Sequence, residues 1–249
     1  YPLGIMFASL LVLTIILVLQ GVLARSPKVL KGVKTSFLLF TLMWLGWYAG
    51  AQISIVHLLS VVRAPVTGWS FESWLLHPLT LVILGFSLVG TLLLGRGVFC
   101  GWLCPFGALQ DLLSAFAKRL QVRQFSVSHS MNSRLWSLKY FVLIGLLWVA
   151  LFSPSYLNSA VEIEPFTTSI LFYFARAWPY TLFAIFILLT SLFVERSFCR
   201  YLCPLGAGLA VAGRIRLLEW LKRRPECGDE CNICGDLCPV QAIGSDGQI

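Results

Sequence analysis

Residues 97–108 read GVFCGWLCPFGA, and residues 196–207 read RSFCRYLCPLGA. Phe, Cys, Leu, Cys, Pro, Gly and Ala recur at the same offsets in both stretches. Each stretch follows two apolar segments joined by a loop, and each leads into a partly polar helix, expected over 106–120 and 205–222. The repeat predicts two units in the same orientation, related by a pseudo-twofold axis along a membrane normal, with the two C-x3-C-P motifs face to face.

The composition around these motifs is that of a membrane protein. Of the 249 residues, 58% are hydrophobic and 12% are charged, a balance that a water-soluble domain could carry only with large exposed apolar patches. Uncharged segments near the length of about 20 residues that crosses a bilayer occur at 3–23, 36–62, 74–95, 140–157 and 177–194. We therefore predict an all-α polytopic membrane protein with about five transmembrane helices.

The positive charges are distributed unevenly among the loops. Segments 24–35, 96–139 and 195–224 carry all but two of the 19 Lys and Arg residues, whereas loops 63–73 and 158–176 hold only Arg63 and Arg176. The positive-inside rule places the basic segments in the cytoplasm, the N-terminus in the periplasm and the C-terminus in the cytoplasm. This topology accounts for the net charge of +8, so we expect membrane lipid and no nucleic acid as a partner.

A second kind of cysteine motif follows Arg224-Pro225, where the composition changes abruptly. Its spacing is C-x3-C-x2-C-x3-C-P, and its ligand candidates are Cys227, Cys231, Cys234 and Cys238. In bacterial ferredoxins three such cysteines bind one [4Fe–4S] cluster and the fourth, before Pro, binds a partner cluster. A four-cysteine zinc site is the alternative. The missing cluster ligands lie either beyond Ile249 or among the membrane-motif cysteines; because the chain looks cut at both ends, we expect them beyond Ile249.

The membrane motifs contribute the other candidate metal ligands: Cys100, Cys104, Cys199 and Cys203. Pro restricts the preceding residue and suits the first position of a helix, so we expect Cys104 and Cys203 at helix N-termini, where the dipole favours a thiolate or an anionic cluster. Four thiolates in two facing pairs suffice for an iron–sulfur cluster or another iron site, or for copper or thiol redox chemistry. A purely structural role stays open.

Four domains follow from these patterns. The first helix and a basic loop occupy 1–35, the first membrane repeat 36–135, the second repeat 136–225, and the start of a cytoplasmic ferredoxin-like 4Fe-4S module 226–249. We interpret His57, His77, His129 and Gln52 as structural hydrogen-bonding residues. No constellation of nucleophile, base and oxyanion donors indicates hydrolysis or group transfer, so we assign no catalytic residue and expect electron transfer.

The motifs also resemble one family. FCGWLCPFGALQD (99–111), VEIEPFTTSI (161–170), VERSFCRYLCPLGA (194–207) and CGDECNICGDLCPVQAI (227–243) look like the membrane and ferredoxin part of the NosR family, which supports the expression and maturation of nitrous oxide reductase in denitrifying bacteria. The resemblance implies a multi-pass inner-membrane protein with two [4Fe–4S] clusters in the full-length chain and FMN on an N-terminal domain outside this sequence. It also implies periplasmic nitrous oxide reductase or its maturation factors as partners, with a quinol or a cytoplasmic carrier as electron donor.

Two alternatives share these motifs. A NapH-like quinol dehydrogenase subunit for periplasmic nitrate reductase would have four spans and an inside N-terminus, so the extra helix at 3–23 argues against it. A copper-handling assembly factor similar to those of cbb3 oxidases would bind copper at the C-x3-C-P cysteines instead of relaying electrons. These motifs are compatible with flavin or quinol oxidoreductase activity, and they do not indicate the direction of electron flow.

Overall fold

The computed structural model describes residues 2–23, 26–67, 78–94, 98–125, 129–156 and 161–215. Within these ranges the chain is helical and contains no β-strand, as the predicted all-α class requires. The predicted ferredoxin-like module over 226–249, with Cys227, Cys231, Cys234 and Cys238, lies outside the described residues.

The first half of the chain forms helices on both sides of the first motif. They are α1 (Pro2–Val18), α2 (Gln20–Leu23), α3 (Pro27–Phe40), the π-helix η1 (Thr41–Tyr48), α4 (Ile55–Thr67), α6 (Pro78–Leu94), the short π-helix η2 (Phe99–Leu103) and α7 (Pro105–Arg119). The second half forms α8 (His129–Phe152), η3 (Pro154–Tyr156), η4 (Thr167–Leu171), α10 (Trp178–Phe193), α11 (Ser197–Tyr201), α12 (Pro204–Ala212) and η5 (Gly213–Ile215).

Two described helices are long and apolar enough to cross a bilayer, judged by length and composition alone. They are Lys28–Tyr48, which joins most of α3 to η1, and Arg134–Phe152 within α8. The predicted spans 3–23, 74–95 and 177–194 correspond to the shorter apolar helices α1, α6 and α10. The number of five transmembrane helices therefore stays a prediction.

The prediction of one helix over 36–62 is wrong. The helix stops at Tyr48, the chain runs without helical structure from Gly50 to Ser54, and α4 begins at Ile55. Gly50 has a φ of +57°, a left-handed conformation that glycine adopts without steric cost and that ends the helix. Hydropathy did not reveal the break because residues 51–54 are as buried as the helices that flank them.

Loop 158–176, predicted on the periplasmic side of the membrane, packs into the helix assembly over its described residues. Residues 164–166 and 168–170 are buried, and Ile170 approaches η1 closely: a Cβ added to Gly46 would lie 3.2 Å from Ile170 Cγ2. The same added Cβ would lie 2.9 Å from Pro105 Cβ, at the start of α7. Glycine at position 46 thus lets the first motif, η1 and the re-entering loop meet at one point.

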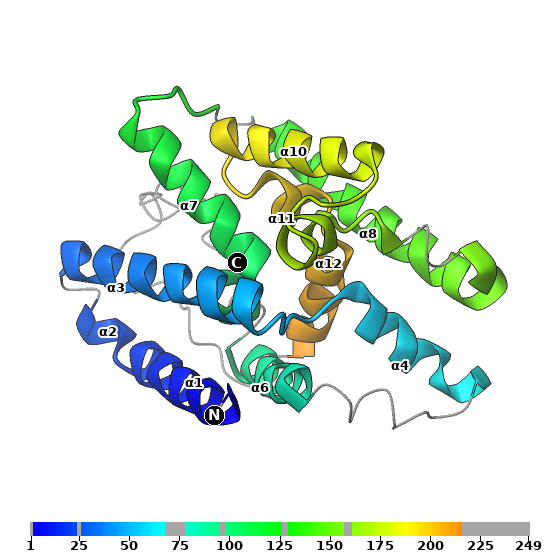
Figure 1. Cartoon of the computed structure of the whole chain (residues 1–249), viewed down its shortest axis with the longest axis horizontal. Helices are drawn as coiled ribbons and strands as arrows, with labels where there is room; N and C mark the ends of the chain where they lie inside the picture. The colour runs from blue at the N-terminus through cyan, green and yellow to red at the C-terminus, as the bar shows by residue number, and fades with distance from the viewer. Residues whose placement is uncertain are drawn as a thin grey trace.

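The two motifs lie near the middle of the helix assembly. Figure 1 shows α11 and α12 in the centre, with α7, α10, α8 and α4 around them. Two clusters of buried side chains meet there, and Cys104 and Cys203 pack against both of them. The fold therefore surrounds the predicted metal ligands with its apolar core.

Candidate metal centre between the two motifs

Both motifs fold into the same turn and helix start. The backbone N–H of Cys104 donates to Phe99 O at 3.0 Å, and that of Cys203 donates to Phe198 O at 2.9 Å. Each of these cysteines then caps the helix that Pro begins, Cys104 for α7 and Cys203 for α12. The predicted position of both cysteines at helix N-termini is confirmed.

The cysteine sulfurs at these caps accept hydrogen bonds from the backbone. Gly107 N–H donates to Cys104 Sγ at 3.4 Å, and Gly206 N–H donates to Cys203 Sγ at 3.2 Å. A Cβ at Gly107 would lie only 3.2 Å from Cys100 O, tighter than ordinary contact, while one at Gly206 would touch Cys203 Sγ at 3.5 Å. Glycine is therefore needed at Gly107, where the helix closes over its own cysteine turn.

The two turns pack against each other. The rings of Phe106 and Phe198 meet edge to face, with centroids 5.5 Å apart, and both side chains are almost fully buried. Arg196, at the start of the second motif, donates from Nη1 to Cys100 O in the first motif at 2.8 Å. Residues 96 positions apart in sequence thus join the two cysteine pairs, as expected of facing motifs.

Burial dominates the electrostatics of the thiols. Together with a smaller contribution from the neighbouring Cys100 thiol, it raises the pKa of Cys104 to about 12, against the opposing effect of Gly107 N–H. Burial also raises the pKa of Cys199 and Cys203 well above the usual thiol value. Burial thus outweighs the expected stabilisation of these thiolates by the helix N-termini, and metal binding would favour their ionised form.

The donor set available at this place is four cysteine thiols in two pairs, one pair from each motif. Over the described ranges, no three His, Cys, Asp or Glu side chains lie close enough together to hold one metal ion. An iron–sulfur cluster distributes its cysteine ligands over several irons, so its thiolates are farther apart than those of a mononuclear site. Four soft thiols in two pairs, with backbone N–H groups directed at Cys104 and Cys203, supply the type and number of ligands that an iron–sulfur cluster uses.

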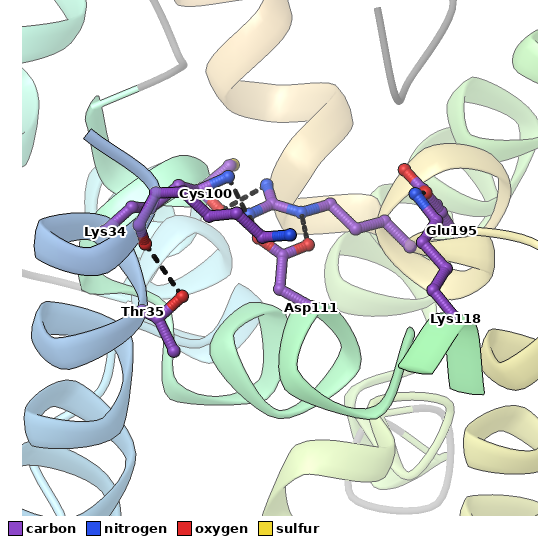
Figure 2. A network of polar contacts seen from close by, with 8 residues as sticks. Lys34, Thr35, Cys100, Asp111, Lys118 and Glu195 are labelled. Carbon is purple, nitrogen blue, oxygen red and sulfur yellow. Dashed lines mark hydrogen bonds and ion pairs between the residues drawn. The ribbon is translucent and has the colours of Figure 1, made fainter. Parts of the chain in front are cut away.

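A polar network ties the motifs to the surrounding helices (Figure 2). Arg196 forms a two-pronged ion pair with Asp111 of α7, and Lys34 of α3 lies 3.4 Å from the same carboxylate. Burial by itself would raise the pKa of Asp111, but Arg196 and then Lys34 overcome it and hold that pKa below its usual value. Asp111 likewise raises the pKa of Arg196, against the opposing effect of burial.

Sequence reasoning did not identify this network. Arg196 has a φ of +51°, a left-handed conformation that a non-glycine residue adopts only when its surroundings hold it there. The aligned position of the first copy is Gly97, a residue suited to that conformation. The sequence contained one signal for this network: Arg196 stands at the repeat position where the first copy has Gly97.

Two further residues approach the cysteines from the broken span and the re-entering loop. Gln52 Nε2 lies 3.9 Å from Cys104 Sγ, so its interpretation as a hydrogen-bonding residue is confirmed. Glu164, expected in an outward loop, is only 2% exposed and accepts from Ser54 Oγ at 2.7 Å and from Ile55 N at 3.1 Å. The Ser54 N–H donates to His57 Nδ1 at 3.2 Å, which fits the structural role predicted for that histidine.

The other predicted residues are not placed. His77 and the four ferredoxin-type cysteines lie outside the described residues, as does the side chain of His129. The structure thus brings together the C-x3-C-P motifs alone.

Comparison with known proteins points to iron–sulfur chemistry. A family described as "4Fe-4S binding domain" matches residues 76–123 and 176–226, so each match contains one C-x3-C-P motif. Regulatory protein NosR of Stutzerimonas stutzeri is 45% identical over all of this chain and 34% of its own length. Protein NirI of Paracoccus denitrificans is 44% identical over 99% of this chain and 36% of its own length.

A third relative is more distant. Ferredoxin-type protein NapH of Haemophilus influenzae is 29% identical over 60% of this chain and 50% of its own length. The chain spans about a third of the length of the two regulatory proteins it resembles. No solved structure matches it.

Proposed function

This chain belongs to the NosR and NirI family of regulatory proteins, and from that premise we propose that it moves electrons across the bacterial inner membrane in support of nitrous oxide reductase. The homology and the 4Fe-4S domain matches support an iron–sulfur protein of an electron-transfer regulatory family. The nitrous oxide reductase role rests on the resemblance to NosR. NosR and NirI match this chain almost equally well, so a NirI-type role is the nearest alternative within the family.

One observation carries the proposal. Two cysteine turns, each inside a segment that matches a 4Fe-4S binding domain, pack against each other in the apolar core. A site with four partly buried thiols packed against apolar side chains suits electron transfer, which needs no general base or oxyanion donors.

The residues of this chain have distinct tasks at such a centre. Cys100, Cys104, Cys199 and Cys203 would hold the cluster, which when bound supplies reversible one-electron transfer. Gly107 and Gly206 N–H groups lower the electron density on the ligand sulfurs, and hydrogen bonds of this kind raise the reduction potential of a cluster. The rings of Phe106 and Phe198 exclude water between the two turns.

A place in the membrane is part of the proposal. Large apolar side chains remain exposed along the long helices, including Phe141 and Trp148 of α8, Phe186 of α10 and Leu11 of α1. Such surfaces are stable against lipid and unfavourable in water. We place the N-terminus in the periplasm and the cysteine motifs with the C-terminus toward the cytoplasm, with a quinol or a cytoplasmic carrier as the donor.

The partner groups follow from the resemblance. The ferredoxin-type cysteines would bind two [4Fe–4S] clusters together with ligands elsewhere in the full-length protein, and FMN on the periplasmic side would receive or supply the electrons. A NapH-like quinol dehydrogenase role is supported by the weaker match to NapH. Copper at the C-x3-C-P cysteines is the remaining alternative.

Iron and acid-labile sulfide per chain test the proposal. We would purify the full-length protein without oxygen and compare it with a Cys100→Ser/Cys199→Ser variant. Two ferredoxin-type clusters account for about eight irons, so a clear excess that the variant loses indicates a cluster between the motifs. Eight irons unchanged by the variant would leave the motif cysteines to copper or thiol chemistry, and the absence of iron would refute the proposed electron relay.

A further inference from the structure

The carboxyl group of Glu164 is buried beside the metal centre without being part of it. Its side chain accepts hydrogen bonds from Ser54 Oγ and from the first backbone N–H of α4, at Ile55. The only ion pair described on its own segment joins Glu162 to Arg176, at 2.6 Å. Burial raises the pKa of Glu164 to about 7, against the opposing effects of these hydrogen bonds.

A short path connects this carboxyl group to the cysteines. Ser54 lies two residues after Gln52 on the buried non-helical segment 51–54, and Gln52 reaches Cys104 Sγ. On the opposite side, the negative charge of Glu164 acts on the Cys203 thiol and raises its pKa. The carboxylate is therefore close enough to Cys203 to respond to a change of charge at the motif cysteines, and the segment that holds it also contacts Cys104 through Gln52.

The broken helix makes this arrangement. A continuous helix over 36–62 would satisfy the backbone N–H of Ile55 internally, whereas the start of α4 leaves it for a carboxylate. Non-helical backbone at membrane depth is tolerated only where protein or a cavity surrounds it, and interrupted spans of this kind mark binding sites in membrane proteins. The carboxyl group of Glu164 thus accepts the hydrogen bonds that the break in the helix leaves available at Ser54 and Ile55.

Other titratable groups lie on the elements packed around Glu164. The Ser54 N–H links the segment to His57 of α4, and Lys139 of α8 is buried over the rings of Trp136 and Tyr140. The remaining groups are Cys203 at the start of α12 and the Glu162–Arg176 pair.

We propose that Glu164 is the proton-binding site coupled to reduction of the centre held by the C-x3-C-P cysteines, an inference that rests on the proposed electron-transfer function. When the centre gains one electron, the Glu164 carboxylate takes up one proton from water and forms an O–H bond. When the electron leaves, that bond breaks and the proton is released. The electron comes from the one-electron donors of the relay, and in the experiment from dithionite.

The physical reason is charge compensation. An electron added in the apolar core raises the cost of a nearby buried carboxylate, because the two negative charges are poorly screened there. Protonation of Glu164 removes that repulsion, and Ser54 can turn its hydroxyl group to accept from the new O–H. Reduction and protonation therefore stabilise each other, as linkage requires.

The test is a redox titration of the full-length protein, purified without oxygen, at several pH values between 5.5 and 8.5. One proton bound per electron changes the reduction equilibrium tenfold per pH unit, which corresponds to about 59 mV. We expect this slope around neutral pH in the unmodified protein and a flat response in Glu164→Gln. Glu162→Gln is the matched control, because it neutralises a carboxylate on the same segment, and it should keep the slope.

A second readout guards against a variant that fails to assemble. Reduced-minus-oxidised infrared spectra of protein labelled with 13C-glutamate should show a carboxylic acid band that appears on reduction and is absent from Glu164→Gln. A pH-independent potential in the unmodified protein, or the same slope in Glu164→Gln with normal iron content, would overturn the inference and leave the proposed function intact. Failure of the proposed function itself would appear separately, as missing iron in the unmodified protein.

Discussion

Replacing Asp111 by Asn should destabilise the protein strongly, because it leaves the charge of Arg196 buried without its counterion. The side chains of Arg196 and Asp111 are only 12% and 18% exposed. Removing one partner of a buried pair costs about 3–5 kcal/mol. Lys34 pairs with the same carboxylate, and its side chain is 41% exposed. Because Lys34 is itself a cation, it cannot neutralise Arg196 once the carboxylate is lost.

The chain contains a matched control for this change. Lys118 and Glu195 form a second ion pair between α7 and the segment that carries Arg196; their side chains are 53% and 17% exposed, so the cation left by a change at Glu195 stays solvated. Exposed pairs contribute about 1 kcal/mol or less. Glu195→Gln should therefore leave stability almost unchanged, although it neutralises a carboxylate one residue away from Arg196.

Thermal unfolding in detergent, followed by tryptophan fluorescence, measures the difference. In a chain of this size 1 kcal/mol shifts the midpoint by about 2–4 °C, so Asp111→Asn should lower it by about 6–20 °C and Glu195→Gln by less than about 4 °C. A double variant, Asp111→Asn with Arg196→Gly, should recover part of the loss because it removes the unpaired charge and suits the φ of +51° at position 196.

Two results would refute this reasoning. One is an Asp111→Asn midpoint equal to that of Glu195→Gln, since the pair would then contribute no more than an exposed one. The other is a double variant less stable than Asp111→Asn alone, since Arg196 would then stabilise the fold through contacts other than the ion pair.

Three other changes have defined outcomes. Gly46→Ala places a Cβ 2.9 Å from Pro105 Cβ and should lower the unfolding midpoint. Gly145→Ala is the control, because its Cβ meets nothing within 4 Å, and it should leave the midpoint unchanged or raise it. Equal shifts of the midpoint in the two variants would contradict the close approach at Gly46. Because the pKa of Glu164 is raised to about 7, the folded state holds its proton more tightly than the unfolded chain, so the free energy of unfolding should fall by about 3 kcal/mol between pH 4.5 and 7. Unfolding measured across that range should lose this slope in Glu164→Gln, and an unchanged slope would assign it to other groups. Phe106→Ala removes a ring that is 1% exposed and should lower the free energy of unfolding by about 3–5 kcal/mol, measured by the same thermal midpoints. A loss below about 1 kcal/mol would mean that the two cysteine turns do not depend on this contact.

The cysteine turns could be predicted because their geometry is local. Pro105 and Pro204 fix where α7 and α12 begin, so Cys104 and Cys203 had to lie at the helix starts. The facing of the two motifs followed from their duplication. These features depend on residues a few positions apart or on a symmetry that the sequence displays.

The break at Gly50 and the burial of Glu164 could not be predicted in this way, because both depend on contacts between distant segments. Hydropathy averages over a window, so an apolar stretch with a non-helical centre looks like one continuous span. Glu164 follows another glutamate at position 162, and two nearby charges are typical of an exposed loop. Its burial is explained by the backbone N–H of Ile55 at the start of α4, which donates to its carboxylate. Arg196 was similarly assigned to topology, since a basic residue at a span end has an ordinary explanation.

The link from Arg196 to Asp111 and Cys100 also sets the order in which the centre can be assembled. Asp111 leaves the ribosome 85 residues before Arg196, which at bacterial rates of synthesis is a delay on the order of ten seconds. During that interval the first cysteine pair exists without its partner turn and without the arginine that fixes its backbone. At the centre proposed above, metal delivered then would meet two thiols instead of four, so faithful loading would favour an insertion step that waits until both cysteine turns have formed.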